Sequence, residues 1–161
     1  MNAKSSLRIG VAGLGNVGAA LLQQVGEDRA GAFAGRAHIT AVSARNRRRQ
    51  SGPPIDHLTW FDDPCEMAAS PDIDIFVELM GGADGPAKRA VEIALAAGKP
   101  VVTANKAMLA EHGRELARLA ENSGAALRFE AAVAGGVPII KALREALRVD
   151  EIKGVAGILN G

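Results

Sequence analysis

The sequence of 161 residues lacks the features that mark secreted, membrane and nucleic-acid-binding proteins. It holds a single cysteine, Cys65, so no disulfide can form within the chain, which suits a reducing compartment. No stretch approaches the roughly 18 consecutive apolar residues of a membrane span, and the first residues carry no apolar secretory segment. Its net charge of +1 creates no field that favours nucleic acid or an anionic membrane. We therefore expect a cytoplasmic protein that binds neither nucleic acid nor a membrane.

Short apolar runs alternate along the chain with longer segments in which apolar residues recur at helical spacing. The runs predict strands at residues 7–12, 38–43, 58–61, 73–79, 101–103, 127–130 and 152–159. The longer segments predict helices at residues 16–27, 64–69, 86–97, 105–122 and 138–147, the last with Pro138 at its first position. This alternation with short turns predicts an α/β fold, a doubly wound parallel sheet with helices on both faces.

A glycine-rich turn between the first strand and the first helix fits the pattern G-x-G-x-x-G. Its members are Gly13, Leu14, Gly15, Asn16, Val17 and Gly18. In that pattern the first glycine makes a tight turn, the second admits a pyrophosphate, and the third lets the helix pack on the strand. The first N–H groups of the helix supply donors to the phosphates. A plain tight turn is the alternative, but the position at the start of a βαβ unit favours a Rossmann-type NAD(P)-binding domain.

The second predicted strand ends without the acidic residue that usually holds the ribose hydroxyls of NAD. No Asp or Glu occurs between positions 28 and 56, and the strand leads instead to Arg45, with Arg47 and Arg48 close behind. An arginine here can pair with a 2′-phosphate and stack on adenine, so Arg45 favours NADP over NAD. A solvated basic loop is the alternative. Nucleic-acid binding is not favoured, because no aromatic residues interleave with the arginines.

Four later segments carry more specific patterns than the glycine turn. They are VELMGG (77–82), VVTANKAMLA (101–110), FEAAVAGGVPIIKALRE (129–145) and GILNG (157–161). With these blocks in this order, the chain resembles homoserine dehydrogenase over essentially its whole length. That family reduces aspartate 4-semialdehyde to homoserine with NAD(P)H, on the route to threonine, methionine and isoleucine. The resemblance implies the nucleotide-binding part of such an oxidoreductase, with NADP, or alternatively NAD, as its cofactor.

The resemblance also implies roles for individual residues. The turn Gly13–Gly18 would hold the pyrophosphate, Gly81 and Gly82 would lie beside the nicotinamide, and Thr103 would contact its ribose side. Lys106 matches the family's lysine between cofactor and substrate, which makes it the catalytic candidate and a further cofactor contact. The dipole of a helix repels a cation in its first turn by roughly 0.3–1 kcal/mol, so a partly buried Lys106 there favours a chemical role. A solvent-facing lysine is the alternative.

The resemblance further implies a bound monovalent cation near Glu130, the sodium ion of the family. Its ligands would be Glu130 and the carbonyl oxygens of Val133, Gly135 and Val137. Ligation by oxygen alone suits a hard cation. Alternatively, Glu130 caps neighbouring N–H groups. We interpret the three histidines as structural or exposed, because none has a cysteine or carboxylate at metal-ligand spacing.

Members of this family are much longer, and the residues that grip their substrate lie beyond the GILNG block. We therefore expect residues 1–150 to form the dinucleotide-binding domain and residues 151–161 to start a truncated substrate domain, which would leave this chain alone inactive. The full-length protein would act on a small-molecule substrate as a homo-oligomer. Two alternatives stay open: a stand-alone NAD(P)H-binding sensor module, and a related dehydrogenase with a different small substrate.

Overall fold

A computed structural model of the chain describes residues 6–27, 35–47, 52–147, 151–154 and 156–157. Within these ranges no helix has the length and apolar character needed to cross a membrane. The strands are β1 (Leu7–Ala12), β2 (Ala37–Ser43), β3 (Thr59–Phe61), β4 (Ile75–Glu78), β5 (Val101–Thr103) and β6 (Leu127–Arg128). The helices are α1 (Asn16–Glu27), α2 (Pro64–Ala69), α3 (Pro86–Ala96), α4 (Lys106–Ser123) and α5 (Ile139–Lys141), with a 3₁₀ turn η1 (Glu130–Ala132) and a π-helical turn η2 (Ala142–Ala146).

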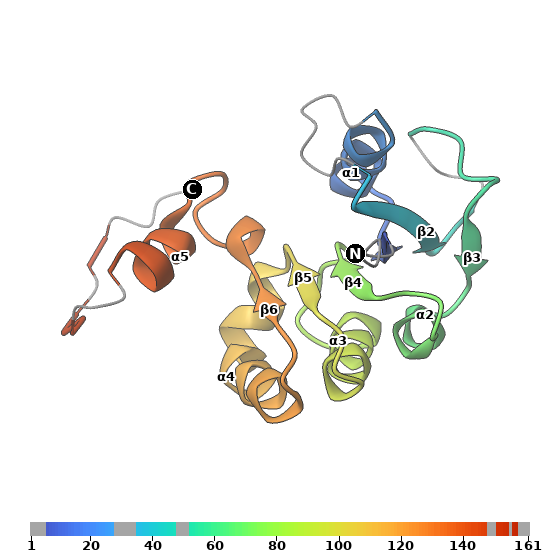
Figure 1. Ribbon diagram of the computed structural model, residues 1–161. Coiled ribbons are helices and arrows are strands. Elements are labelled where there is room, and N and C mark those ends of the chain that lie inside the picture. The colour runs from blue at the N-terminus through green and yellow to red at the C-terminus, as the bar shows by residue number, and fades with distance from the viewer. Residues whose placement is uncertain (1–5, 28–34, 48–51, 148–150, 155, 158–161) are drawn as a thin grey trace, which may run out of the picture.

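The six strands form one sheet in the order β3–β2–β1–β4–β5–β6, and every neighbouring pair is parallel. From β1 the chain first builds outward through β2 and β3, then crosses back to β4 and builds in the opposite direction. The strand order therefore reverses between β1 and β4, and a ligand crevice forms at such a point in open α/β sheets. The prediction of a doubly wound parallel sheet is confirmed (Figure 1).

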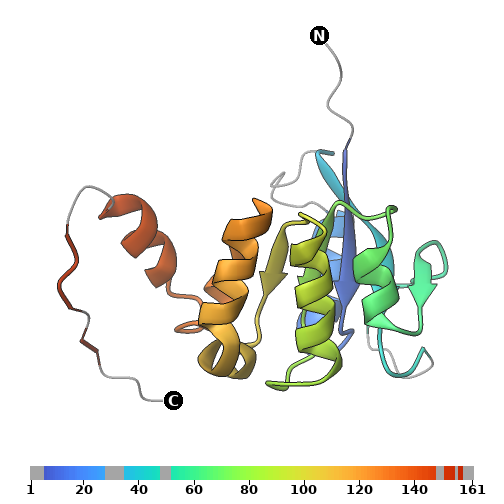
Figure 2. The same ribbon diagram turned by 90° about the horizontal axis from the view of Figure 1, so that it is seen from below.

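Helices cover both faces of the sheet, and alternate residues of each strand meet them. On one face, Leu22 of α1 packs with Ile9 and Val11 of β1. On the other face α2, α3 and α4 stand side by side (Figure 2), and Phe76 of β4 and Leu116 of α4 belong to their common core. This separation into two apolar clusters follows from the two-residue period of a strand.

The ends of the helices follow local signals in the sequence. Asp63 Oδ1 accepts a hydrogen bond from the Cys65 N–H at 2.8 Å, which caps α2 at its start. Gly98 and Gly124, with φ of 75° and 69°, follow α3 and α4 in a conformation that side chains disfavour. The predicted bounds of α1, α2, α3 and α4 agree with the structure to within one residue, and such short-range devices explain the agreement for the helices that have them.

The amino end of β4 differs from the prediction, because the strand begins at Ile75 rather than at residue 73. Asp74 instead accepts hydrogen bonds from Arg8, through the backbone N at 2.8 Å and the guanidinium Nη2 at 2.8 Å. These hydrogen bonds lower the pKa of Asp74, because they stabilise its carboxylate.

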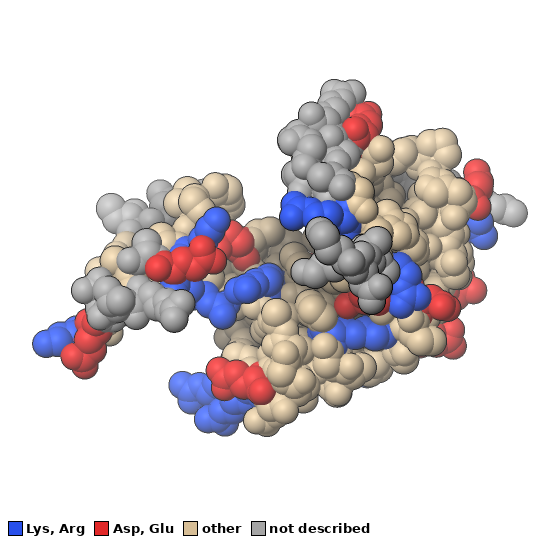
Figure 3. Space-filling view, viewed as in Figure 1, with Lys and Arg blue, Asp and Glu red and all other residues tan. Residues whose placement is uncertain are grey.

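Acidic and basic side chains lie interspersed over the face drawn in Figure 3, as expected for a chain of balanced charge.

The segment after β6 departs furthest from the prediction. A helix was expected over 138–147, but α5 comprises Ile139–Lys141, Pro138 is its N-cap rather than its first residue, and η2 follows. This segment lies apart from the sheet (Figures 1 and 2). The strand expected at 152–159 is wrong for residues 152–154, 156 and 157, which form no strand, and the rest of it lies outside the described residues. A short strand needs a neighbouring strand for its hydrogen bonds, and no described strand pairs with this one.

Candidate functional site

The candidate site begins at the carboxyl edge of the central strands, which run downward in Figure 2. Ala12, the last residue of β1, pairs in register with Ser43 on one side and Glu78 on the other, and Glu78 pairs with Thr103. Ser43, Glu78 and Thr103 in this row, together with Asn105 just beyond β5, are the buried polar residues of the described chain. Burying a polar side chain costs free energy unless it has a hydrogen-bond partner. Several buried polar side chains at one edge therefore suggest a function there beyond packing.

The glycine turn after β1 shows three different uses of glycine. Gly13 has φ of 102°, and a Cβ there would lie 2.5 Å from the carbonyl oxygen of Leu79. A Cβ on Gly18 would lie 2.1 Å from the carbonyl oxygen of Gly13, so the absence of a side chain lets α1 meet the turn. A Cβ on Gly15 would meet no atom within 4 Å. Gly15 thus faces open space, where a ligand can approach the backbone.

The other members of the turn differ in what they can offer a ligand. Leu14 is buried in the cluster around α1, so only its backbone can reach a ligand. Asn16 and Val17 are exposed, and the apolar side chain of Val17 keeps 60% of its surface open. They also begin α1, where free N–H groups suit phosphate oxygens. The turn has the form that the sequence predicts for a pyrophosphate site.

A second glycine turn follows β4 next to the first one. Gly81 and Gly82 are exposed and have φ of 78° and 88°, values that side chains rarely adopt. The N–H of Leu79 donates to the Ala12 carbonyl at 2.7 Å, which joins the ends of β1 and β4. The two glycine turns therefore leave the sheet side by side.

Buried hydrogen bonds tie the second glycine turn to the end of β5. Glu78 Oε1 accepts from the N–H of Met80 at 2.7 Å and of Gly81 at 3.1 Å. Its Oε2 accepts from the Thr103 hydroxyl at 2.5 Å. The Thr103 side chain is fully buried and thus engaged inside the protein. The sequence prediction gave Glu78 no role, although a charged residue within an apolar strand was the available signal.

Asn105 continues the same network on the far side of the turn. Its N–H donates to Thr103 Oγ1 at 3.0 Å, and its side-chain amide donates to the Gly82 carbonyl at 2.7 Å. Its Oδ1 accepts from the Met108 N–H at 3.1 Å and so caps α4. One residue therefore sets both the glycine turn and the start of the helix that carries Lys106.

Lys106 lies in the first turn of α4, as predicted, although the helix begins at this residue rather than at Asn105, and it lies on the same edge as the two glycine turns. No acidic residue stands in the first turn of α4 to offset the repulsion between this cation and the helix dipole. The expectation of partial burial is wrong, because Lys106 is exposed. The inward face of α4 is instead occupied by Met108, Leu116 and Ala120. The ammonium group is consequently open to a ligand on the rim.

The arginines of the basic loop after β2 differ in their surroundings. Arg45 is exposed two residues beyond Ser43, at the edge of the sheet that carries the glycine turn. Arg47 lies over the ring of Trp60, with 5.6 Å between its guanidinium carbon and the ring centroid, so it has a packing role. Arg48 lies outside the described residues. Of the described arginines in this loop, Arg45 is thus the one that has no ring contact and stays a candidate for a 2′-phosphate.

Glu130 acts as a helix cap in this structure, which was the alternative to its role as a cation ligand. Its Oε1 accepts from the Ile140 N–H and its Oε2 from the Lys141 N–H, both at 3.0 Å. The expected strand over 127–130 ends at Arg128, so Glu130 begins a 3₁₀ turn rather than ending a strand. Each carboxylate oxygen retains a second lone pair. Of the predicted carbonyl ligands, that of Val137 accepts the Ile139 N–H at 2.8 Å, so both it and Glu130 already have partners within the protein.

Asp84, Glu111 and His112 form a surface cluster that the sequence pattern did not reveal. His112 Nε2 lies 2.9 Å from Asp84 Oδ1, and one ligand atom from each of the three residues lies within 4.8 Å of the others. Asp84 follows the second glycine turn and the other two belong to α4, so 28 residues of sequence separate the main pair. The cluster gives the exposed side of the turn a further contact with α4.

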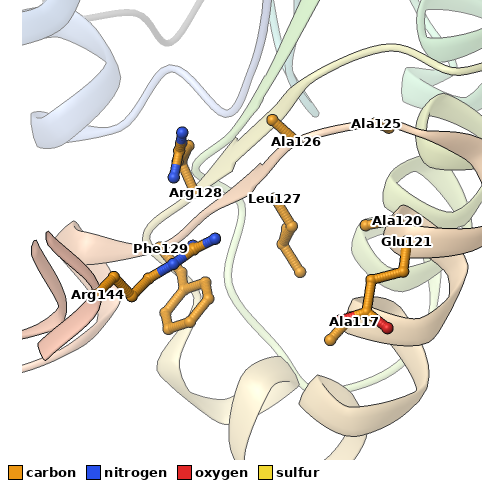
Figure 4. Close-up of a pocket in the computed structure, with 9 residues that line it drawn as sticks. All are labelled: Ala117, Ala120, Glu121, Ala125, Ala126, Leu127, Arg128, Phe129 and Arg144. Atoms are coloured by element: carbon orange, nitrogen blue, oxygen red, sulfur yellow. The ribbon is translucent and has the colours of Figure 1, made fainter. Parts of the chain in front are cut away.

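A hollow of about 500 Å³ opens beside β6, at the outer edge of the sheet. Ala120 and Leu127 form part of its wall, and Phe129 and Arg144 lie together at one end (Figure 4). It contains none of the residues that the sequence predicts for a site. Strands β4 and β5 separate β6 from β1, so this hollow is separate from the glycine turn that follows β1.

Comparisons with known proteins agree on one family. A family model described as the NAD-binding domain of homoserine dehydrogenase matches residues 13–130. A homoserine dehydrogenase of Neisseria gonorrhoeae is 45% identical over 160 residues, which is 96% of this chain and 36% of that protein. One of Mycobacterium tuberculosis is 42% identical over 156 residues, which is 95% of this chain and 35% of that protein. The chain thus spans about a third of the length of these relatives.

Solved structures show the same likeness. The crystal structure of a homoserine dehydrogenase from Thiobacillus denitrificans superposes with a TM-score of 0.77 at 38% identity, over 89% of this chain and 34% of that chain. A hyperthermophilic archaeal homoserine dehydrogenase in complex with NADPH superposes with a TM-score of 0.69 at 24% identity, over 86% of this chain and 48% of that chain. At that identity, the second likeness shows a shared fold alone.

Proposed function

The chain belongs to the homoserine dehydrogenase family, and from this we propose that it is the nucleotide-binding part of an oxidoreductase that interconverts L-aspartate 4-semialdehyde and L-homoserine with NAD(P)H. The reaction would serve the synthesis of threonine, methionine and isoleucine. One observation carries the proposal: the turn at Gly15, the pair Gly81–Gly82 and Lys106 leave neighbouring strands on a single rim. A dinucleotide that spans such a rim brings its nicotinamide close to the lysine.

The proposed roles follow from the surroundings of each residue. The N–H groups of the first glycine turn would hold the pyrophosphate, because Gly15 leaves the backbone open. Gly81 and Gly82 would leave room for the nicotinamide ring, since they present no side chain. The bound nicotinamide would supply the hydride. Lys106 would hold the substrate oxygen on which negative charge develops, and an ammonium group lowers the energy of that charge.

Further parts of the proposal concern the whole protein. We place the dinucleotide-binding domain within residues 1–150 and the start of the substrate domain at residues 151–161. α5 falls within the first of these ranges but lies apart from the sheet (Figure 1), so the sheet and the helices that cover it occupy residues 7–128. The full-length protein would work in the cytoplasm as a homo-oligomer on its small-molecule substrate, and most of its substrate contacts would come from outside this chain.

The function can be tested with the protein expressed from its complete open reading frame. We expect NADPH oxidation with aspartate 4-semialdehyde, and NADP⁺ reduction with homoserine. NADPH binding without turnover of either compound would contradict the enzyme and favour a sensor module. Turnover of a different aldehyde or ketone, with no turnover of aspartate semialdehyde, would favour a related dehydrogenase.

We also propose a sodium ion near Glu130, held by its carboxylate and by the carbonyl oxygens of Val133, Gly135 and Val137. The all-oxygen donor set supports this, although Glu130 already accepts two N–H groups. The same assay tests it when sodium is replaced by choline at constant ionic strength. Lower activity in choline, restored by millimolar sodium, is expected. Unchanged activity would leave Glu130 as a helix cap alone.

Arg45 gives a prediction about the choice of cofactor. Replacing Arg45 with Ala should weaken NADPH binding by about tenfold, as expected for loss of one charge-assisted hydrogen bond near the surface, and leave NADH binding nearly unchanged. The measurement is a fluorescence titration of both cofactors. Arg47→Ala is the matched control, because Arg47 lies on Trp60. Equal affinities for NADPH and NADH in the unmodified protein would refute the assignment.

A further inference from the structure

Glu78 is the charged side chain that the described core buries completely, with none of its surface exposed. Burial of a carboxylate opposes folding unless several donors compensate it. Here three donors do so: two backbone N–H groups from the glycine turn and one hydroxyl from β5. An apolar residue of similar size would fill the same space without this requirement. We therefore explain the presence of a buried carboxylate by the groups that its hydrogen bonds hold in place, namely the glycine turn and the end of β5.

The directions of these hydrogen bonds require an acceptor at both oxygens of Glu78. The Thr103 hydroxyl has one proton, and its oxygen already accepts from the Asn105 N–H, so the proton is directed at Glu78 Oε2. Glu78 Oε1 faces two N–H groups, which also need an acceptor. Glutamine has nearly the same shape but offers an acceptor at one end only. It would face either the N–H pair or the hydroxyl with its own N–H₂ group.

The network connects two parts of the rim that belong to different strands. Glu78 holds the N–H groups of Met80 and Gly81, while Asn105 holds the carbonyl of Gly82 from the opposite side. Asn105 also caps α4, whose first residue is Lys106. The second glycine turn and the start of α4 are thereby fixed relative to each other.

We propose that Glu78 is a positioning residue for the nicotinamide half of the cofactor site, acting through Thr103 and Asn105 on the Gly81–Gly82 turn and on Lys106. This inference rests on the proposed function, because it takes that turn as the place of the nicotinamide. Thr103 then contributes as a link within the protein, since its buried hydroxyl is engaged by Glu78 and Asn105. The adenine half of the site, at the Gly15 turn and Arg45, lies outside this network.

The test compares ligands with and without a nicotinamide, on the full-length protein. Glu78→Gln should weaken NADPH binding by about tenfold and leave 2′,5′-ADP, which lacks the nicotinamide, within twofold of the unmodified protein. Misplacement of the ring should also lower kcat by about 100-fold. If the unmodified protein prefers NADH, NADH and ADP replace this pair. Glu92→Gln on α3, whose carboxylate pairs with Lys88 near the surface, is the matched control and should change neither affinity.

A second pair of variants covers the case in which Glu78→Gln does not fold. Thr103→Val removes the hydroxyl and should reproduce the selective loss of NADPH affinity, while Thr103→Ser retains the hydroxyl and should restore most of it. Equal weakening of NADPH and 2′,5′-ADP, or no weakening of either, would reduce Glu78 to a structural role and leave the proposed function standing. Failure of the unmodified protein to bind either ligand would overturn both proposals.

Discussion

Gly15→Ala is expected to weaken cofactor binding by about 100-fold, roughly 2.7 kcal/mol, without lowering the thermal stability of the protein. The backbone of Gly15 lies outside the left-handed region, and a Cβ there would touch no atom within 4 Å. Alanine at this position therefore introduces neither backbone strain nor a clash in the folded protein. A ligand bound against the backbone of this turn would clash with the added methyl group. Titration with NADPH measures the first effect and thermal unfolding measures the second.

Gly18→Ala should have the opposite signature, although it changes the same motif. Its Cβ would lie 2.1 Å from the Gly13 carbonyl oxygen, which belongs to backbone and cannot turn aside. The helix must shift away from the strand, and overpacking of this kind costs about 1–3 kcal/mol or more. We therefore expect a clear loss of thermal stability, with cofactor binding lost as a consequence.

Gly26→Ala, in the same helix, serves as the control for both changes. A Cβ at Gly26 would meet no atom within 4 Å, so alanine should raise helix stability by about 0.5–1 kcal/mol. It should leave NADPH affinity unchanged. If Gly15→Ala binds NADPH as tightly as the unmodified protein, the pyrophosphate is not held at this turn, and the proposed cofactor site fails with it.

The parts of the fold that could be predicted from the sequence are those set by neighbouring residues. The cap at Asp63 and the glycine at 124 act within a few positions, and the helices they bound agree with the prediction. The residues of the rim were also named in advance, because the two glycine turns and the block that contains Lys106 are local patterns.

The network around Glu78 could not be predicted in this way. Glu78 and Thr103 are 25 residues apart in sequence, and they become partners because β4 and β5 pair in register. Glu130 illustrates the same limit, since its partners Ile140 and Lys141 belong to a helix whose position depends on the turn between them. Lys106 shows a second limit. Its proposed role comes from the sequence segment VVTANKAMLA, but its exposure to solvent depends on which side chains of α4 face the core.

Lys106→Met should lower kcat by about 10²–10⁴-fold in the full-length protein, the range expected when a group that stabilises charge or transfers a proton is removed. The same change should leave thermal stability equal or slightly higher. Lys106 is exposed, and removing a cation from the first turn of a helix relieves a repulsion of about 0.3–1 kcal/mol. A variant that gains stability as it loses turnover would identify a residue retained for chemistry.

Lys99→Met provides the contrast that makes this signature decisive. Lys99 Nζ donates to the carbonyl oxygens of Ala68 and Ser70, at 2.8 Å and 2.5 Å, and burial lowers the pKa of its ammonium group. Its loss should lower thermal stability, because two carbonyl groups lose their donor, and leave kcat of the folded enzyme unchanged. Steady-state kinetics and thermal unfolding of both variants complete the comparison. Turnover of Lys106→Met within threefold of the unmodified enzyme would remove Lys106 from the reaction and return it to the alternative of a solvent-facing lysine at a helix start.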